Sequence, residues 1–110
     1  MYARIARFEG GDPGAVDEQI AEMRTQLEGV KAGEMPADAP AEVRTLMETV
    51  ARFIQLVDRE SATFVGITFC ETEEQMRRAD EALNRMSPDA GVGGRTAVDI
   101  FEVAIDQSFG

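Results

Sequence analysis

The chain contains no histidine and no tryptophan, and its single cysteine is Cys70. Histidine is the side chain that most often acts as a general base near neutral pH, as a metal ligand and as a haem ligand. Its absence removes the usual centres of acid–base, zinc and haem chemistry, so we expect no cofactor and no metal. One cysteine cannot form an intrachain disulfide, which favours a reducing compartment.

Basic residues are also scarce, because 11 Lys and Arg stand against 21 Asp and Glu, a net charge of −10. Such a charge repels phosphate backbones and anionic lipid, so nucleic acids and membranes are poor candidates for partners. No apolar run approaches the roughly 20 residues that a membrane-spanning helix requires. The residues after Met1 show no basic stretch followed by an apolar core, so we expect no secretory signal and a cytoplasmic location.

The first half of the chain predicts a strand followed by two helices. Tyr2 to Glu9 has the composition of a strand and ends at a glycine pair. Asp12 and Pro13 then supply an N-cap acceptor and a first-turn proline. The stripe of the first helix is Val16, Ile20, Met23 and Leu27.

A connector over residues 32–40 separates that helix from a second, shorter one that begins at Pro40. The short helix carries apolar residues at i, i+3, i+4 and i+7, and we expect it to give way to a strand near Ala51. Its stripe is Val43, Leu46, Met47 and Val50.

Two adjoining strands with a polar link predict a hairpin. The first runs from Arg52 to Val57, the link from Asp58 to Ser61, and the second from Thr63 to Glu71. Side chains of the second strand alternate between two faces. One face carries Val65, Ile67 and Phe69, and the other carries Phe64, Gly66, Thr68 and Cys70.

The clearest local signal is the capping box that begins at Thr72 and includes Gln75. It predicts the start of a helix that ends at Ser87-Pro88. A glycine-rich loop over 89–95 and a last strand over 96–106 follow. The buried stripe of this helix is Met76, Ala79, Leu83 and Met86.

This order of elements predicts one α+β domain over residues 1–106, with a frayed tail at 107–110. The fold class is ferredoxin-like βαββαβ with an extra short helix before the second strand. Both main helices should cover one face of the sheet. Phe64 and Val65 point to opposite faces of their strand, and so do Ile100 and Phe101, so both faces of these strands are apolar. We therefore expect the uncovered face to pack against a second sheet in a homodimer.

Several segments carry a resemblance to a known family. They are Leu56-Val57-Asp58-Arg59-Glu60-Ser61, the run from Gly66 to Glu74, Ala82-Leu83-Asn84-Arg85-Met86, and the run from Phe101 to Asp106. Together they resemble small bacterial proteins of the dimeric α+β barrel superfamily, and antibiotic-biosynthesis-monooxygenase-like domains are the nearest named group. The resemblance implies a dimer whose two sheets form a barrel, with a small-molecule cavity between the sheet and the helices of each protomer.

The same superfamily contains cofactor-independent oxygenases, haem-degrading enzymes and lactone isomerases. Its haem-degrading members use a histidine ligand, and this chain has no histidine. Its oxygenases often carry a tryptophan and an asparagine near the substrate, whereas here tryptophan is absent and the single asparagine, Asn84, falls on a helix. No functional residue can therefore be transferred by position.

The polar residues of the strands are the candidate ligand contacts, namely Tyr2, Arg4 and Thr68. A charged side chain in a covered sheet needs a partner or a ligand, and Arg4 could steer a carboxylate or phenolate. The alternative is an ion pair between Arg4 and Asp99 on neighbouring strands. Cys70 is interpreted as a small core residue because no histidine is present to activate it.

The leading hypothesis is a homodimer that binds a small apolar or aromatic molecule without metal or haem. A cofactor-independent monooxygenase is the first alternative, and a protein-interaction module is the second. Methionines on the helix stripes would suit an adaptable apolar cavity as well as a filled core. A cavity between the sheet and the helices would favour the first two hypotheses, and a filled core the third.

Overall fold

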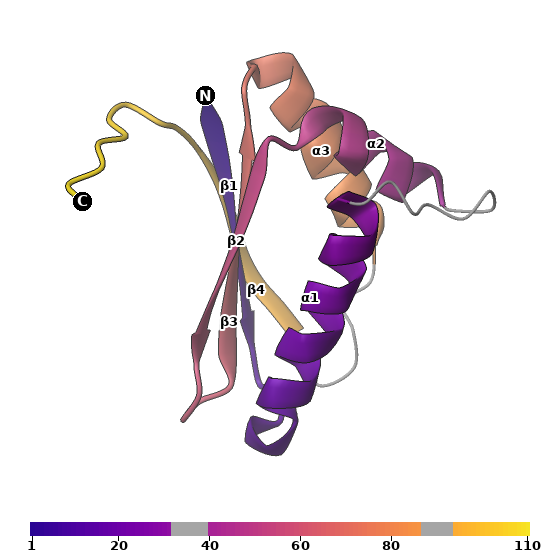
Figure 1. Cartoon of the computed structure of the whole chain (residues 1–110), viewed down its shortest axis with the longest axis vertical. Helices are drawn as coiled ribbons and strands as arrows, with labels where there is room; N and C mark the ends of the chain where they lie inside the picture. The colour runs from indigo at the N-terminus through magenta and orange to yellow at the C-terminus, as the bar shows by residue number, and fades with distance from the viewer. Residues whose placement is uncertain (32–39, 87–93) are drawn as a thin grey trace.

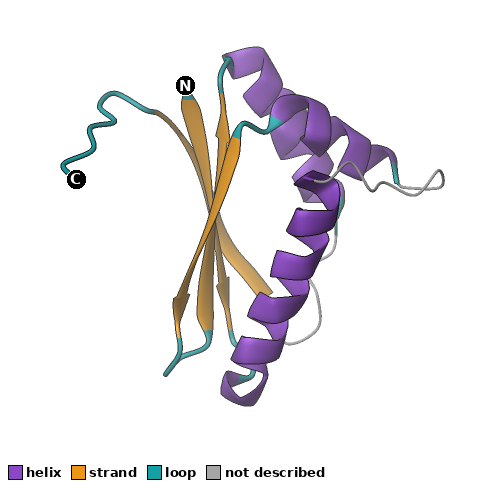
Figure 2. Cartoon of the chain, in the orientation of Figure 1, coloured by secondary structure: helices purple, strands orange, loops and turns teal. Residues whose placement is uncertain are grey.

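The computed structural model of the chain describes residues 1–31, 40–86 and 94–110. In chain order the elements are β1 (Tyr2–Glu9), the 3₁₀ helix η1 (Pro13–Ala15), α1 (Val16–Lys31), α2 (Ala41–Thr49), β2 (Arg52–Asp58), β3 (Thr63–Cys70), α3 (Glu73–Arg85) and β4 (Gly94–Glu102). The strands form one antiparallel sheet in the order β2-β3-β1-β4. All the helices cover the same face of that sheet (Figures 1 and 2). This α+β architecture is compatible with the predicted ferredoxin-like fold.

The register of the central strands decides which side chains face the helices. Arg4 on β1 pairs with Thr68 on β3 and with Ile100 on β4, and directly paired residues share a face. The Arg4 side chain bonds to Asp80 of α3, so these positions lie on the helix side. The residues between them, Ile5 and Ile67 among them, lie on the opposite face, which we call the open face.

The start of α1 follows its sequence signals. Gly10 adopts a left-handed φ of 82°, which a glycine reaches without steric cost, and the chain turns there after β1. The Asp12 side chain then accepts a hydrogen bond from the Gly14 backbone N–H at 2.9 Å. With Pro13 in its first turn, η1 leads directly into α1 at Val16.

The predicted change from helix to strand near Ala51 is confirmed, because α2 ends at Thr49 and β2 begins at Arg52. The capping box of α3 is also confirmed. The Gln75 backbone N–H donates to Thr72 Oγ1, and the Thr72 N–H donates to Gln75 Oε1, both at 3.1 Å. These reciprocal bonds satisfy two backbone donors that the first turn of a helix would otherwise leave unpaired.

The last strand differs from its predicted range of 96–106, because β4 runs from Gly94 to Glu102. The Val103 N–H donates to the Met1 carbonyl at 2.8 Å, which is the last described backbone bond from β4 toward β1. Regular strand pairing does not extend into residues 104–110. The predicted helix stop at Ser87-Pro88 and most of the glycine-rich loop lie outside the described residues.

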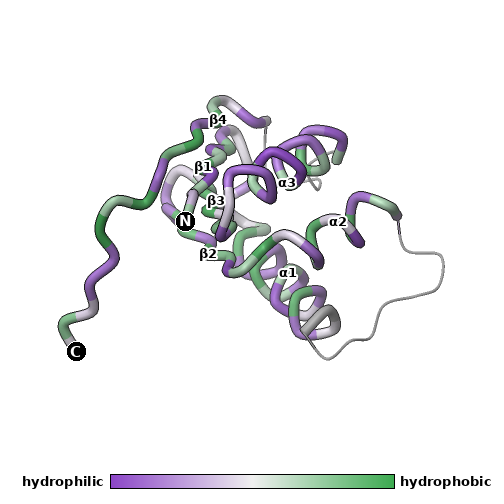
Figure 3. Tube along the Cα trace, turned by 90° about the horizontal axis from the view of Figure 1, so that it is seen from above, coloured by the Kyte–Doolittle hydropathy of each residue, from purple (hydrophilic) through white to green (hydrophobic). Residues whose placement is uncertain are grey.

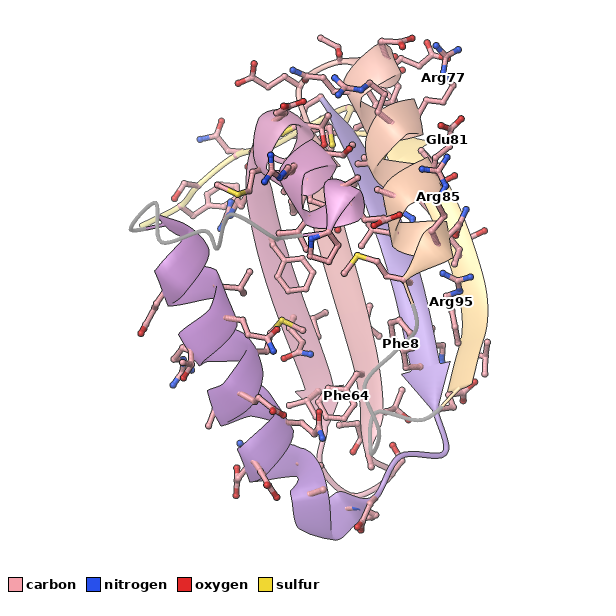
Figure 4. All side chains as sticks on the ribbon, turned by 90° about the vertical axis from the view of Figure 1, so that its right-hand side faces the viewer. Phe8, Phe64, Arg77, Glu81, Arg85 and Arg95 are labelled. Carbon is pink, nitrogen blue, oxygen red and sulfur yellow. The ribbon has the colours of Figure 1, made fainter. Side chains whose placement is uncertain are left out.

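Among the described residues, buried side chains form two core clusters on the helix side. The first joins the start of α1 to the β2–β3 turn and contains Val16, Ala62 and Phe64, packed against Phe8, Ile20 and Val57. The second joins α2 and α3 to the sheet and contains Cys70, Met76 and Ala79, packed against Tyr2, Leu46 and Val50. Figure 4 shows Phe8 and Phe64 below α2 and α3, on the helix-covered side of the sheet.

Candidate functional site

A cleft of about 520 Å³ lies between α1 and β2 on the helix side of the sheet. Figure 1 shows α1 standing apart from the sheet over most of its length. The cleft is lined by Ile20, Met23, Arg24, Leu27 and Glu28 from α1, Phe53, Gln55 and Val57 from β2, and Arg59 from the turn that follows β2.

The apolar stripe of α1 becomes more exposed along the helix. Val16, at the first turn, is 3% exposed, whereas Leu27, three turns later, is 42% exposed. Ile20 and Met23 lie between these extremes and are half-buried. The predicted stripe therefore exists, but its second half faces the cleft instead of a filled core.

The sheet side of the cleft is formed by Phe53, Gln55 and Val57 of β2. Gly66 of β3 pairs with Gln55 of β2 on one side and with Ala6 of β1 on the other. The Phe53 ring lies over Gly66, where a Cβ atom would meet the ring carbon Cε2 at 3.4 Å. Glycine at this position thus leaves space for the ring, and the ring supplies an aromatic surface to the cleft.

Charged side chains stand at the rim of the cleft. Arg59 Nη1 donates to Asp17 Oδ1 at 2.5 Å, which ties the β2–β3 turn to the first turn of α1. Arg24 and Glu28 line the cleft from one side of α1. No ion pair to Arg24 is formed within residues 1–31, 40–86 and 94–110, so its guanidinium is available to an anionic group.

Arg4, one of the predicted ligand contacts, lies outside this lining and is bonded to α3. Its Nε donates to Asp80 Oδ1 at 2.8 Å, and its Nη2 donates to Asn84 Oδ1 at 3.0 Å. The Arg4 side chain is 4% exposed and that of Asp80 is 26% exposed. The predicted pair between Arg4 and Asp99 was wrong, because Asp99 pairs with Ile5 in the sheet and therefore lies on the open face.

The other two predicted contacts, Tyr2 and Thr68, do not line the cleft either. Tyr2 packs against the second core cluster, and Thr68 is 4% exposed in the middle of the sheet. Thr68 is nevertheless the cross-strand partner of Phe53, so it lies beside the cleft floor. Cys70 is fully buried, and this burial raises the pKa of its thiol, which keeps it protonated and unreactive.

The open face carries an apolar surface of its own. In the described part of the chain no element covers it, since every helix lies on the opposite side (Figure 1). Leu56 on β2 is 50% exposed and Phe101 on β4 is 55% exposed. The remaining apolar residues of the open face include Ala3, Ile5, Ile54, Val65, Ile67, Phe69 and Ala97.

Comparison of the sequence with models of protein families and with curated proteins gives no match. Among the described residues, no helix is long and apolar enough to cross a membrane. The same residues contain no group of three or more His, Cys, Asp or Glu side chains that could hold a metal ion. The identification of the cleft as a candidate site therefore rests on the geometry of the structure.

The sequence predicted the lining residues as a helix stripe and a strand and predicted a cavity between sheet and helices, but the contacts it named were Tyr2, Arg4 and Thr68. An apolar stripe on a helix predicts the side that turns inward and leaves open how closely that side approaches the sheet. One signal was present, because Gly66 is a glycine in the middle of a predicted strand. Its meaning becomes clear once the pairing of β2 with β3 is known and the Phe53 ring is found over Gly66.

Proposed function

We propose that the protein binds a small, largely apolar or aromatic molecule in the cleft between α1 and β2. The observation that carries the proposal is the half-exposed stripe of α1, which faces a cleft of about 520 Å³. Ligand sites in proteins have volumes of roughly 300–1,000 Å³ and are lined mainly by apolar and aromatic side chains. The thioether of Met23 adapts to ligands of different shape, and the Phe53 ring offers a surface for stacking.

Arg24 suggests that the ligand carries an anionic group, such as a carboxylate, sulfonate or phenolate. Binding is favoured over catalysis because the ionisable side chains of the lining are Arg24, Glu28 and Arg59. Arginine stays protonated in proteins and does not transfer protons, so this set lacks the paired groups that acid–base catalysis requires.

A titration with 8-anilinonaphthalene-1-sulfonate, an aromatic anion, tests the site. We expect saturable binding of one dye per chain and an affinity loss of at least about tenfold in Met23→Glu, which places a charge in the apolar part of the cleft. Gln26→Glu adds the same charge to an exposed position of α1 outside the lining and serves as the control. Equal losses in both variants, or binding that does not saturate, would contradict the proposal.

We further propose that two copies associate through their open faces. Leaving Leu56, Phe101 and the apolar residues around them in water is unfavourable, and contiguous apolar patches of this kind commonly mark association surfaces. Light scattering should give about twice the chain mass of 12.0 kDa. Ile67→Glu, in the central strand β3, should give a monomer while Gln26→Glu stays a dimer. A monomeric unmodified protein would contradict this association.

A further inference from the structure

The last residues of the chain form an arm that leaves the body of the molecule. Figures 1 and 3 show the tail running clear of the sheet from the end of β4. Ile105 is 86% exposed and Phe109 is 96% exposed, although both are large apolar residues. Their exposure costs hydrophobic free energy that contact with another surface would recover.

The arm continues the apolar side of β4. Phe101 pairs with Ala3 and lies on the open face. In an extended chain Val103, Ile105 and Phe109 follow on the same side as Phe101, because side chains alternate with a period of two. Figure 3 shows hydrophobic (green) segments along the tail. The arm therefore carries an apolar stripe that faces the side on which a second copy would pack.

The sheet offers an edge that matches such an arm. In the described sheet β2 pairs with β3 and has no neighbour on its other side. The outward backbone groups of β2 are thus free to add a strand, and apolar side chains such as Ile54 and Leu56 flank them. Arg52 is exposed at the start of β2, and Asp106 supplies an acidic group on the arm of a chain with few bases.

We propose that residues 104–110 of each copy pair with the free edge of β2 in the second copy and form the outer wall of its cleft. The inference rests on the proposed dimer and on the proposed ligand site. Twofold symmetry would place both arms in equivalent positions, so that each chain gives one strand and receives one. Since β2 also lines the cleft through Phe53, Gln55 and Val57, the arm lies beside the bound molecule.

Hydrogen exchange in a chain that ends at Val103 tests the arm. In the full chain the outward-facing amides of β2, those not already bonded to β3, should exchange at least about tenfold more slowly than in the shortened chain, because pairing with the arm protects them. The amides of β1 and β3 serve as the internal control and should not change. The affinity for 8-anilinonaphthalene-1-sulfonate should also fall, and Phe109→Ser should reproduce part of this loss without removing any backbone.

Mixed dimers show from which chain the arm comes. Isotope-labelled shortened chain is mixed with full chain, and exchange is followed in the labelled chain. Recovery of protection at residues 52–58 of the labelled chain supports the proposal. Absence of recovery would mean that the arm pairs with β2 of its own chain, which would contradict the proposal. If β2 exchange or dye affinity is unchanged in the shortened dimer, the pairing of the arm with β2 is contradicted, while the proposed dimer and the proposed ligand site still stand. A full chain that is monomeric contradicts both the proposed dimer and the pairing of the arm.

Discussion

The helices α3 and α1 cover the same face of the sheet, but α3 packs against it more closely than α1 does. On α3 the residues that face the sheet are almost inaccessible, with Met76 at 2%, Ala79 at 0% and Ala82 at 1% exposure. On α1 the equivalent stripe opens progressively, and Leu27 is 42% exposed. One helix thus closes its side of the sheet, and the other leaves a cleft.

The difference follows from the side chains at each contact. Alanines on α3 let its backbone approach the sheet closely, whereas α1 presents the larger side chains of Ile20, Met23 and Leu27 toward β2. Polar ties differ as well. Arg4 anchors α3 from beneath, and Arg78 of α3 donates to Glu48 of α2 at 3.0 Å. The comparison teaches that a filled core and a binding site can share one sheet when the contact residues differ in size.

The largest expected effect on stability comes from truncating one methionine of α3 and one of α1. Met76→Ala should lower the free energy of unfolding by about 3 kcal/mol, because it leaves a cavity among fully buried neighbours. Met23→Ala, the same change at a half-buried position of the cleft, should cost less than about 1 kcal/mol. Urea unfolding measures both values. Similar costs at the two sites would mean that α1 packs in solution as closely as α3.

The ion pairs provide a second contrast between the two sides. Asp80→Ala should cost about 2 kcal/mol, because it leaves the guanidinium of Arg4 buried without its carboxylate. Arg59→Ala breaks the ion pair with Asp17. Both side chains of this pair are well exposed, so the change should cost less than about 1 kcal/mol. Thermal unfolding distinguishes the two. If Asp80→Ala were neutral, Arg4 would reach water or a ligand, which would revive its predicted role as an anionic anchor.

The helix caps should differ by a smaller amount. Thr72→Ala removes the forward bond of the capping box and should destabilise the protein by about 1 kcal/mol, while Thr72→Ser keeps an acceptor and serves as the control. Asp12→Ala removes the single bond before η1 and should cost about half as much. Chemical denaturation provides the measurement. A larger cost at Asp12 would show that the entry to α1 depends on its cap more than α3 does.

The smallest expected effect is on the pH dependence of stability and comes from Cys70, which is buried under α2 and α3. Burial raises the pKa of the Cys70 thiol above its ordinary value of 9.0. The thiol therefore contributes stability that is complete below pH 9.0 and is lost as the pH rises through the folded-state pKa, because the unfolded chain ionises first. Cys70→Ala should flatten the fall in unfolding free energy above about pH 9. Identical slopes in both proteins would refute a buried, protonated thiol.

Prediction from the sequence succeeded where the determining contacts are local. Thr72 and Gln75 are three residues apart and form the predicted cap, and the alternation from Thr63 to Cys70 placed Val65 and Phe64 on opposite faces. The partner of Arg4 was missed because Asp80 lies 76 residues away on another element. The end of β4 was missed because its composition stays strand-like after regular pairing with β1 stops at Glu102.

The sequence by itself determined the element order, the α+β class, the caps and the side of each element that turns inward. Those features depend on side-chain periodicity and on hydrogen bonds between near neighbours. Tertiary structure decided the distance between α1 and the sheet, the division of the core into two clusters and the exposure of Ile105 and Phe109. These depend on which side chains meet across the sheet, such as Phe53 over Gly66, and no local pattern encodes such a meeting.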